Sequence, residues 1–464
     1  MAETNHVAVI GAGISGLACA YRLQQLGLPV TLFESENQAG GLMGTVEKDG
    51  FLFESGPQSF QGTETILDLI RHLGIEGELC KADPRAPRWV LQRGRLQKIP
   101  MSPQGLIASS LLGAASRWKI VSEPFRRTKS PSEDESVADF VRRKFGHEIL
   151  EYLVSPFVSG VYAGDPEKLS LRAAFPSLEE WEREYGSVIR GAMKSRPTEI
   201  KGKRTPPSLC SFRCGVQALP KAIAERLAGN VRFGARVDGI RHGDAGDTFE
   251  VCICENGRAE TISAHAVVLA TPAYVAAHLM APVSQSLAHQ LSGIAYAGVA
   301  VAAFGYFANQ IGVPLEGFGV LVPRNEKLRT LGTVWNSSLF PHRAREGSAV
   351  ITSFVGGATD SEILDKPEDE IAALVQADNA KILRITGSPA TSTVWKHPKA
   401  LPQYNLGHHH IVQSIRDGEL KNPGLFFSGN YLEGPSLGKC IEHGFKTADA
   451  VRDFLQRQPR SISS

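Results

Sequence analysis

The sequence predicts a protein of mixed α/β and α+β class with more than one domain. Three observations predict this class. Residues 7–34 read as a strand, a glycine turn, a helix and a second strand, which is the βαβ unit of a parallel sheet. Residues 291–315 contain no charged side chain and alternate in the manner of buried strands. Residues 100–129 carry apolar side chains at helical spacing.

Length and composition limit the possible functions. A chain of 464 residues has room for two or three domains with substantial cores. Its formal net charge of +2 gives no general attraction to nucleic acid, so we expect no nucleic-acid partner. The seven cysteines show neither a disulfide framework nor zinc-site spacing, which indicates reduced thiols in a cytosolic compartment and no metal site.

The first βαβ unit contains the features that a bound dinucleotide requires. Gly11, Gly13 and Gly16 occupy the G-x-G-x-x-G positions between strand and helix, where they allow a tight turn and close approach of a pyrophosphate. The helix N-terminus offers free N–H groups to the phosphates. Glu34 ends the second strand, where its carboxylate can accept both ribose hydroxyls and disfavours a 2′-phosphate. The contacts expected here are Gly11, Gly13, Ile14, Ser15, Gly16, Glu34 and Ser35.

A second glycine pair favours FAD over NAD. Gly40, Gly41 and Leu42 follow Glu34 in the E-x5-G-G arrangement that is typical of FAD oxidoreductases. Residues 51–58 read as a strand that ends in a turn at Gly56 and Pro57, which returns toward the nucleotide. A βαβ turn without a nucleotide would explain the first glycines alone, but not the acid and the second pair in register.

The next segments supply a candidate anion site and a candidate interfacial helix. Residues 63–73 are helical by spacing, and Arg93-Gly94-Arg95 predicts a solvated hairpin turn. Arg88 enters an apolar strand, where an arginine can clamp a carboxylate. Residues 100–129 combine an apolar helical face with Trp118, which is typical of docking on a membrane surface. A helix packed on its own domain explains them equally well. The adjoining charged residues are Arg117, Lys119, Glu123, Arg126, Arg127 and Lys129.

Residues 152–195 carry a family resemblance. Gly160 and Gly164 fit places where the backbone approaches a flat ligand, before a turn at Asp165-Pro166. Ser136 predicts the cap of a helix over 137–145, and Ser177 with Glu180 predicts a capping box. The text G-V-Y-A-G-D-P and F-P-S-L, followed by Y-G-S-V-I-R-G, resembles the oxygen-dependent, FAD-containing protoporphyrinogen oxidases of the plant and related bacterial branch.

The resemblance extends to the C-terminus and implies further site residues. It implies that Val237, on a strand over 231–240, contacts the adenine, and that Thr271 lies at a turn near the FAD. Gly429 and Asn430 follow a strand, and a helix over the following residues directs its positive end at the flavin. Substrate residues implied by the residues and the family are Arg88 for a propionate, Gly160 and Gly164 for the pyrroles, and Leu321 and Phe340 for the macrocycle. The C-terminal cofactor residues are Gly429, Asn430, Gly434 and Leu437.

The family also implies an architecture. A Rossmann-like FAD-binding domain of the amine-oxidase (GR2) type is expected from residues 1–60, 213–275 and 421–464. A mixed-sheet substrate domain is expected from 61–100 and 276–420, and a helical, membrane-binding domain from 101–212. Leu42 departs from the arginine that amine oxidases of this superfamily usually have after the glycine pair. His408, His409 and His410 are expected in an exposed loop, because consecutive residues cannot all face one metal ion.

The implied chemistry is oxidation of a tetrapyrrole. Protoporphyrinogen IX would pass hydride from a meso carbon to flavin N5, and O2 would reoxidise the flavin with release of hydrogen peroxide, without a catalytic side chain. The alternatives are a coproporphyrinogen III oxidase, a flavin amine oxidase or carotenoid desaturase, and a non-enzymatic FAD-binding scaffold. We expect a cytoplasmic chain without a targeting segment, peripherally attached to the inner face of the cell membrane. A homodimer is compatible with the sequence, which does not fix the oligomeric state.

Overall fold

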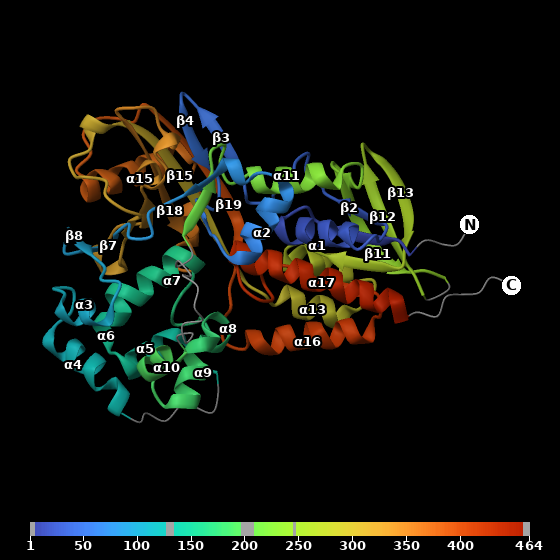
Figure 1. Ribbon diagram of the computed structural model, residues 1–464, viewed down its shortest axis with the longest axis horizontal. Helices are drawn as coiled ribbons and strands as arrows, with labels where there is room; N and C mark the ends of the chain where they lie inside the picture. Colours follow the sequence, from blue (N-terminus) through green and yellow to red (C-terminus); the bar gives the residue numbers. More distant parts are fainter. Residues whose placement is uncertain (1–4, 127–133, 196–207, 245–246, 458–464) are drawn as a thin grey trace.

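The computed structural model describes residues 5–126, 134–195, 208–244 and 247–457. Figure 1 shows a parallel-sheet domain, which carries both ends of the chain, beside a mixed-sheet domain and a helical lobe. Chain segments remote in sequence build each of the first two domains, so the cofactor and substrate residues come together only in the folded protein.

The parallel-sheet domain is built on the predicted βαβ unit. Its five-stranded sheet has the order β10-β2-β1-β14-β20, and every neighbouring pair is parallel. All side chains of β1 are buried because helices and a second sheet cover its two faces, as a continuous apolar strand requires. The strands are β1 Val7–Ile10, β2 Val30–Phe33, β10 Val231–Arg232, β14 Ala266–Leu269 and β20 Leu425–Phe427.

Two sets of elements cover this sheet. On one face α1 and α17 pack together, and Gly444 makes that approach possible because a Cβ there would lie 2.5 Å from the Ser15 carbonyl oxygen. An antiparallel sheet and three helices cover the other face. The first set is α1 Ile14–Gln25, α2 Glu64–Leu73, α11 Ala218–Leu227 and α17 Leu437–Arg457; the second is β11 Ala235–His242, β12 Phe249–Glu255, β13 Arg258–Ala264, α12 Ala273–Met280, α13 Gln285–Ser292 and α16 His408–Lys421.

Several boundaries differ from the predicted ones. The strand expected over 231–240 is divided into β10 and β11, because the chain turns at Gly234 (φ 66°). The strand expected over 51–58 ends at Glu54. The structure also places α2, α13 and α16 in the cores of the parallel-sheet domain, although the predicted boundaries assign them to the substrate domain. Helices α11 and α17 pack on α2, α12 packs on α13, and α13 packs on α16. Periodicity within a single helix cannot show these partners.

The second domain is a seven-stranded mixed sheet of order β19-β15-β18-β17-β16-β7-β8. The charge-free segment 291–315 supplies β15, a buried strand as predicted. Helix α15 (Glu368–Leu383) covers one face, as Figure 1 shows, and Ile371 and Val375 pack there with β15 and β18. The strands are β7 Arg88–Gln92, β8 Arg95–Lys98, β15 Tyr296–Phe307, β16 Gly319–Leu321, β17 Thr330–Val334, β18 Ser348–Gly356 and β19 Thr391–Pro402.

Shorter elements connect these domains. The hairpin β3–β4 packs Phe51 and Phe53 on the sheet face opposite α15, and β5, β6 and β9 form a small sheet at the junction. The predicted turn at Arg93 and Gly94 joins β7 to β8, with both residues at positive φ, as a two-residue hairpin requires. The connecting strands and short helix are β3 Thr45–Lys48, β4 Phe51–Glu54, β5 Phe60–Gln61, β6 Leu79–Lys81, β9 Leu209–Phe212 and α14 Asn336–Leu339.

The helical lobe contains the third part of the chain. The predicted cap at Ser136 is confirmed, because its hydroxyl accepts from the Asp139 N–H at the start of α5. The capping box at Ser177 is wrong: α9 begins at Pro176, so Ser177 lies inside the first turn. The segment over 100–129 forms two helices, separated at Gly113. The lobe comprises α3 Pro103–Ala108, α4 Ala114–Ser122, α5 Val137–Lys144, α6 His147–Ile149, α7 Ser155–Tyr162, α8 Leu171–Ala174, α9 Pro176–Tyr185 and α10 Val188–Lys194.

The structure also describes the triple histidine, the helix lengths, the cysteines and the groups of side chains that could bind a metal. The triple histidine does not form an exposed loop: His408 begins α16, is buried, and donates through Nε2 to the Tyr431 carbonyl (2.8 Å). No helix within the described segments is long and apolar enough to cross a membrane. All seven cysteines are free, with Cys19, Cys210 and Cys440 buried. Across the described ranges, histidine, cysteine and acidic side chains nowhere gather in threes that could hold a metal ion.

Candidate functional site

The first glycine turn forms a backbone cradle at the end of β1. Gly11 has a φ of 102°, and a Cβ on Gly16 would lie 2.0 Å from the Gly11 carbonyl oxygen, so both positions require glycine. Helix α1 begins after Gly13 without a side-chain cap and without an acidic residue in its first turn. Its N-terminal N–H groups, at Ile14, Ser15 and Gly16, are therefore available to an anion.

The acid and the second glycine pair lie beside this cradle. Glu34 accepts hydrogen bonds from the backbone N–H of Ala12 (2.7 Å) and Glu36 (2.9 Å), which fixes its carboxylate at the end of β2, with Ser35 adjacent. Gly40 donates its N–H to the Ala12 carbonyl (2.9 Å), and a Cβ on Gly41 would lie 3.6 Å from the Gly13 Cα. The two glycine turns therefore form one wall.

Further predicted cofactor residues complete the site from other strands. The Ala235 N–H donates to the Glu34 carbonyl (2.8 Å), which places the start of β11, with Val237, at the end of β2. Gly56 lies against Leu42, since a Cβ on Gly56 would lie 2.1 Å from the Leu42 carbonyl oxygen, and Pro57 follows at an exposed position.

The turn after β14 provides a test of whether a cofactor fits. A Cβ on Gly11 would lie 3.3 Å from Thr271 Cγ2, so Thr271 borders the first glycine turn. Its buried hydroxyl has no hydrogen-bond partner among the described residues. A buried polar atom of this kind normally has a partner, so the Thr271 hydroxyl fits a polar ligand that passes the first glycine turn.

The C-terminal segment approaches from the far side. It runs from Gly429 and Asn430, after β20, through Gly434 (φ 137°) to Leu437, the first residue of α17. The Tyr404 hydroxyl donates to the Asn430 carbonyl, and Ser436 accepts from the Lys439 N–H (3.4 Å) at the start of α17. Helix α17 also has no acidic residue in its first turn, and it lies against the start of α1, where a Cβ on Gly444 would meet the Ser15 carbonyl.

Of the substrate residues predicted from the sequence, Arg88 and Leu321 lie on one face of the mixed sheet. Leu321 pairs with Val90 and Gly332, Gly332 with Phe354, and Phe354 with Val301, so these side chains form one row across five strands. This row lies on the face opposite α15. Arg88 lies two residues from Val90 on β7 and therefore points to the same face.

Arg88 is half-buried and has no acidic partner. Its guanidinium lies 5.8 Å from the centre of the Phe318 ring, and Nη1 lies 3.5 Å from the Met101 sulfur. In the chain as described, no carboxylate is within ion-pair distance of it. On β7, β16 and β17 it is the one arginine or lysine that faces this side. A cation held in an apolar setting without a counter-charge suits a carboxylate ligand.

Gly160 and Leu321 come together although 160 residues separate them. Gly160 lies in α7, and a Cβ there would lie 2.8 Å from Leu321 Cδ2. Gly164 follows Ala163, the left-handed C-cap of α7, and approaches Gln403. Helix α7 therefore packs directly against this row of side chains at Leu321.

Phe340 belongs to the same region but is only 2% exposed. It packs with Val334, Leu339 and the half-buried Phe354. Phe354 and Trp395, which the sequence analysis did not single out, offer more accessible aromatic surface on this face. Their alternation along β18 and β19 is a signal for strands, but it does not tell which face meets a ligand. His397, on the same face of β19, donates to the Ser55 carbonyl (2.7 Å) and joins this sheet to the turn at Gly56.

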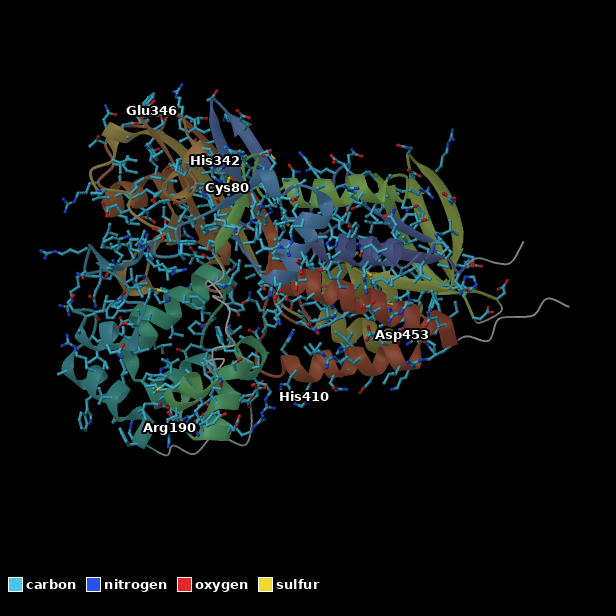
Figure 2. All side chains as sticks on the ribbon, viewed as in Figure 1. Cys80, Arg190, His342, Glu346, His410 and Asp453 are labelled. Carbon is cyan, nitrogen blue, oxygen red and sulfur yellow. The ribbon has the colours of Figure 1, made fainter. Side chains whose placement is uncertain are left out.

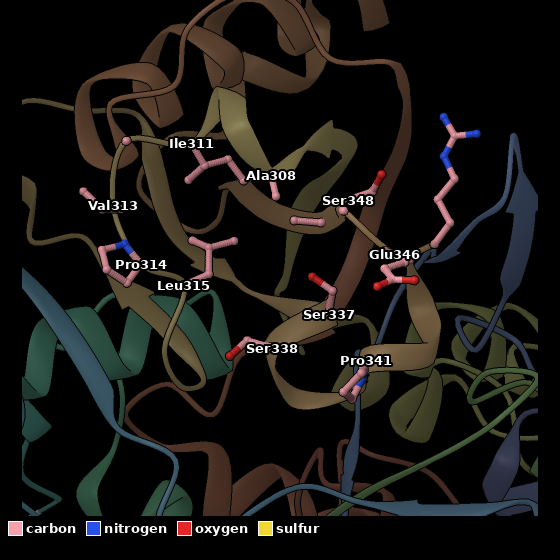
Figure 3. Close-up of a pocket in the computed structure, with 15 residues that line it drawn as sticks. Ala308, Ile311, Val313, Pro314, Leu315, Ser337, Ser338, Pro341, Glu346 and Ser348 are labelled. Carbon is pink, nitrogen blue, oxygen red and sulfur yellow. The ribbon is translucent and has the colours of Figure 1, made fainter.

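A separate hollow of about 850 Å³ lies at another end of the mixed-sheet domain. Figure 3 shows it open between the end of β15 and the segment after α14. None of the predicted cofactor or substrate residues lines it. Its lining is Ala308, Ile311, Gly312, Val313, Pro314, Leu315, Ser337, Ser338, Pro341, Ala344, Arg345, Glu346, Gly347, Ser348 and Ala349.

The parallel sheet, the two glycine turns and the second helix N-terminus define the class of protein, which is dinucleotide-binding. Comparison with known proteins identifies its family. The model of the flavin-containing amine oxidoreductases matches residues 14–452. Protoporphyrinogen oxidase 1, chloroplastic, of Arabidopsis thaliana is 35% identical over 98% of this chain and 89% of its own length.

Two more relatives refine the comparison. Coproporphyrinogen III oxidase of Bacillus subtilis is 29% identical, over 97% of this chain and 98% of its own. A crystal structure from Exiguobacterium sp., assigned to the protoporphyrinogen oxidases, superposes with a TM-score of 0.82 at 23% identity and covers 98% of this chain and 100% of that one. The chain belongs to the flavin-containing amine oxidoreductases and, within them, to the protoporphyrinogen oxidase family. It is an FAD-dependent oxidase.

Proposed function

We propose that the protein oxidises protoporphyrinogen IX to protoporphyrin IX, with O2 as electron acceptor and hydrogen peroxide as by-product. The observation that carries the proposal is the face of the mixed sheet opposite α15. There Arg88, which has no acidic partner among the described residues, borders a row of apolar side chains that includes Leu321 and Phe354. Protoporphyrinogen is a broad apolar tetrapyrrole with two propionates, and it matches this combination of surfaces.

The residues of the chain bind, orient and shield the substrate. Arg88 would hold a propionate, and Leu321 and Phe354 would pack on one side of the macrocycle. Gly160 lets α7 pack on Leu321, because a Cβ there would lie 2.8 Å from Leu321 Cδ2. Bound FAD supplies the two-electron oxidation and passes the electrons to O2. Pyrrole N–H protons can leave to solvent as conjugation extends, so no general base is needed on this face.

Coproporphyrinogen III is the second candidate substrate. It carries four carboxylates and would require more cations around the ring. The single arginine on this part of the face favours the dicarboxylate substrate. The Arabidopsis thaliana relative, which is named for protoporphyrinogen oxidation, is also more similar to this chain than the Bacillus subtilis relative (35% against 29% identity).

A steady-state assay tests the proposal. The purified FAD-loaded protein is mixed in air with protoporphyrinogen IX or coproporphyrinogen III, and porphyrin fluorescence and O2 uptake are recorded together. We expect fluorescent protoporphyrin, with one O2 consumed for each two-electron step. A higher kcat/KM for coproporphyrinogen would assign the second candidate, and no turnover of either would refute porphyrinogen oxidation.

We further propose that the helical lobe docks on the cytoplasmic face of the cell membrane. Trp118, Val121 and Phe125 recur at helical spacing over α4 and the following turn, and all three are exposed, with Phe125 at 86%. Met101, just before α3, and Met193, in α10, are also exposed on this lobe. Apolar side chains this exposed and this close in sequence support an interfacial surface for an oily substrate.

The basic residues near this surface contribute less than the sequence suggests. Arg117 donates to the carbonyls of Leu112 and Ser109, and Arg126 donates to those of Lys119 and Lys144, so both serve the fold of the lobe. Arg127 and Lys129 lie outside the described residues. We therefore expect burial of the aromatic side chains to supply more of the membrane affinity than charge does.

Vesicle co-sedimentation tests the membrane proposal. The variant Trp118→Ser/Phe125→Ser should lose at least about tenfold in partitioning, because burial of each aromatic side chain contributes roughly 2 kcal/mol. The control Leu420→Ser changes an equally exposed apolar residue on α16 (81% exposed) and should bind as the wild type does. Equal recovery of all three proteins on neutral and anionic vesicles would contradict the proposal.

A further inference from the structure

A completely buried ion pair joins the cofactor site to the substrate domain. Arg343 Nη2 lies 2.7 Å from Glu54 Oε1, and both side chains have 0% exposure. Glu54 ends β4, two residues before Gly56. Arg343 follows α14, three residues after Phe340. Figure 2 labels the neighbouring residue, His342, beside Cys80 at the junction of the two domains.

Glu54 holds segments of the cofactor side. Its carboxylate accepts from the Val216 N–H (2.9 Å) and the Thr45 hydroxyl (2.5 Å), so it fixes the segment before α11 and the first residue of β3. The backbone carbonyl of Glu54 accepts from Gln58 Nε2 (3.2 Å), which also donates to the Gly56 carbonyl (2.7 Å). The turn at Gly56 and Pro57 therefore has its geometry set from both of its ends.

Arg343 extends the network to the substrate side. The same Nη2 donates to the Gln58 carbonyl (3.2 Å) and to the Ser211 hydroxyl (2.5 Å). The guanidinium carbon lies 5.1 Å from the centre of the Phe340 ring, a cation–π arrangement. Asn336, in α14, donates to Gln58 Oε1 (2.7 Å) and attaches the helix before Phe340 to the same turn.

Stability alone is a weak explanation for this pair. Desolvation of two buried charges usually offsets most of their attraction, and well-packed neutral residues often serve equally well. Arg343 Nε and Nη1 have no hydrogen-bond partner among the described residues, so the guanidinium is only partly satisfied. What the pair does provide is a fixed distance between the Gly56 turn and Phe340, at a place where the two domains meet.

We propose that Glu54 and Arg343 are positioning residues, which hold the Gly56–Pro57 turn against the cofactor and Phe340 against the substrate face in mutual register. The inference rests on the proposed function for its substrate half, while its cofactor half concerns FAD alone. Loss of the pair should therefore alter both the flavin environment and KM, without removing any group that contacts the reacting atoms.

The test compares single and double variants. Glu54→Gln and Arg343→Met each leave an unpaired buried partner and should lower the melting temperature. The double variant Glu54→Gln/Arg343→Met removes both charges and should recover most of it, because Gln can still accept from the Val216 N–H and donate to Thr45. If the pair positions the site, the double variant keeps a KM at least about tenfold above wild type and a shifted visible flavin spectrum.

Two controls keep the proposal falsifiable. Lys144→Met breaks a buried ion pair with Glu182 in the helical lobe and should lower stability while KM and the flavin spectrum stay unchanged. Arg343→Lys retains the charge but not the planar fork, so it should fold and still raise KM. Wild-type KM and flavin spectrum in the double variant or in Arg343→Lys would overturn the proposal. Wild-type failure to turn over protoporphyrinogen would refute the proposed function instead, and the flavin spectra would still decide the cofactor half.

Discussion

Replacement of Arg88 by alanine is the most direct perturbation of the proposed substrate site. Arg88 is half-buried, faces the substrate side of the mixed sheet and has no acidic partner among the described residues. A hydrogen bond to a charged group contributes about 1.5–3 kcal/mol, and partial exposure favours the lower end. Because 1.4 kcal/mol is a factor of ten, we expect KM to rise about ten- to thirtyfold with little change in kcat.

The assay includes a modified substrate. The dimethyl ester of protoporphyrinogen lacks the carboxylates, so Arg88→Ala should leave its KM almost unchanged, and the difference between the two substrates isolates the ion pair. Lys98→Ala is the matched control. It removes the same charge from the same hairpin, but Lys98 pairs with Trp89 and so faces the other side of the sheet. An equal effect of Arg88→Ala on the acid and the ester, or no effect on either, would refute the assignment.

Two further predictions concern the cofactor and pH. Gly13→Ala should fold normally, because the φ of Gly13 is −66° and a Cβ there would meet no described atom within 4 Å. It should still raise the Kd for FAD at least about tenfold, because the added methyl group enters the space before α1. The control Gly77→Ala, at an equally open position, should leave that Kd unchanged. FAD fluorescence titration measures the Kd of both variants and of the wild type. The same Kd for Gly13→Ala and the wild type would contradict the prediction. Burial raises the pKa of Glu419 from 4.5 to about 7. Between these pH values the folded state therefore binds more protons than the unfolded state. The free energy of unfolding of the wild type should fall by up to about 3 kcal/mol as pH rises from 5 to 8. Urea unfolding should show a smaller loss of stability with pH in Glu419→Gln, which keeps the hydrogen bond from the Phe427 N–H. The same dependence of stability on pH in the variant and the wild type would contradict the prediction.

The sequence predicted the parts of the fold that depend on local pattern. The βαβ unit, the Arg93–Gly94 hairpin, the Ser136 cap and the buried strand within 291–315 each follow from residue types a few positions apart. Domain membership does not, because α2 and α16 carry ordinary amphipathic patterns and only their packing partners place them with the parallel sheet. His408 shows the same limit: its burial depends on the Tyr431 carbonyl, which lies 23 residues away.

In the candidate site, too, the sequence predicts what depends on local pattern and misses what depends on long-range packing. The glycine turns and Glu34 form a recognisable motif, because a phosphate and a ribose dictate residue types at fixed spacing. The substrate face has no such motif, since an apolar macrocycle requires only surface. Phe354 and Trp395 were therefore missed. The Glu54–Arg343 pair joins residues 289 positions apart, and neither local sequence contains a signal for the other.

Anaerobic mixing of the FAD-loaded protein with protoporphyrinogen IX, coproporphyrinogen III or a polyamine shows directly which of these substrates the flavin oxidises. The absorbance of oxidised flavin is followed by stopped flow, so that substrate oxidation is separated from the reaction with O2. If the protein is a protoporphyrinogen oxidase, protoporphyrinogen should bleach the flavin fastest and the polyamine should leave the flavin oxidised. Faster bleaching by coproporphyrinogen or by the polyamine would contradict it.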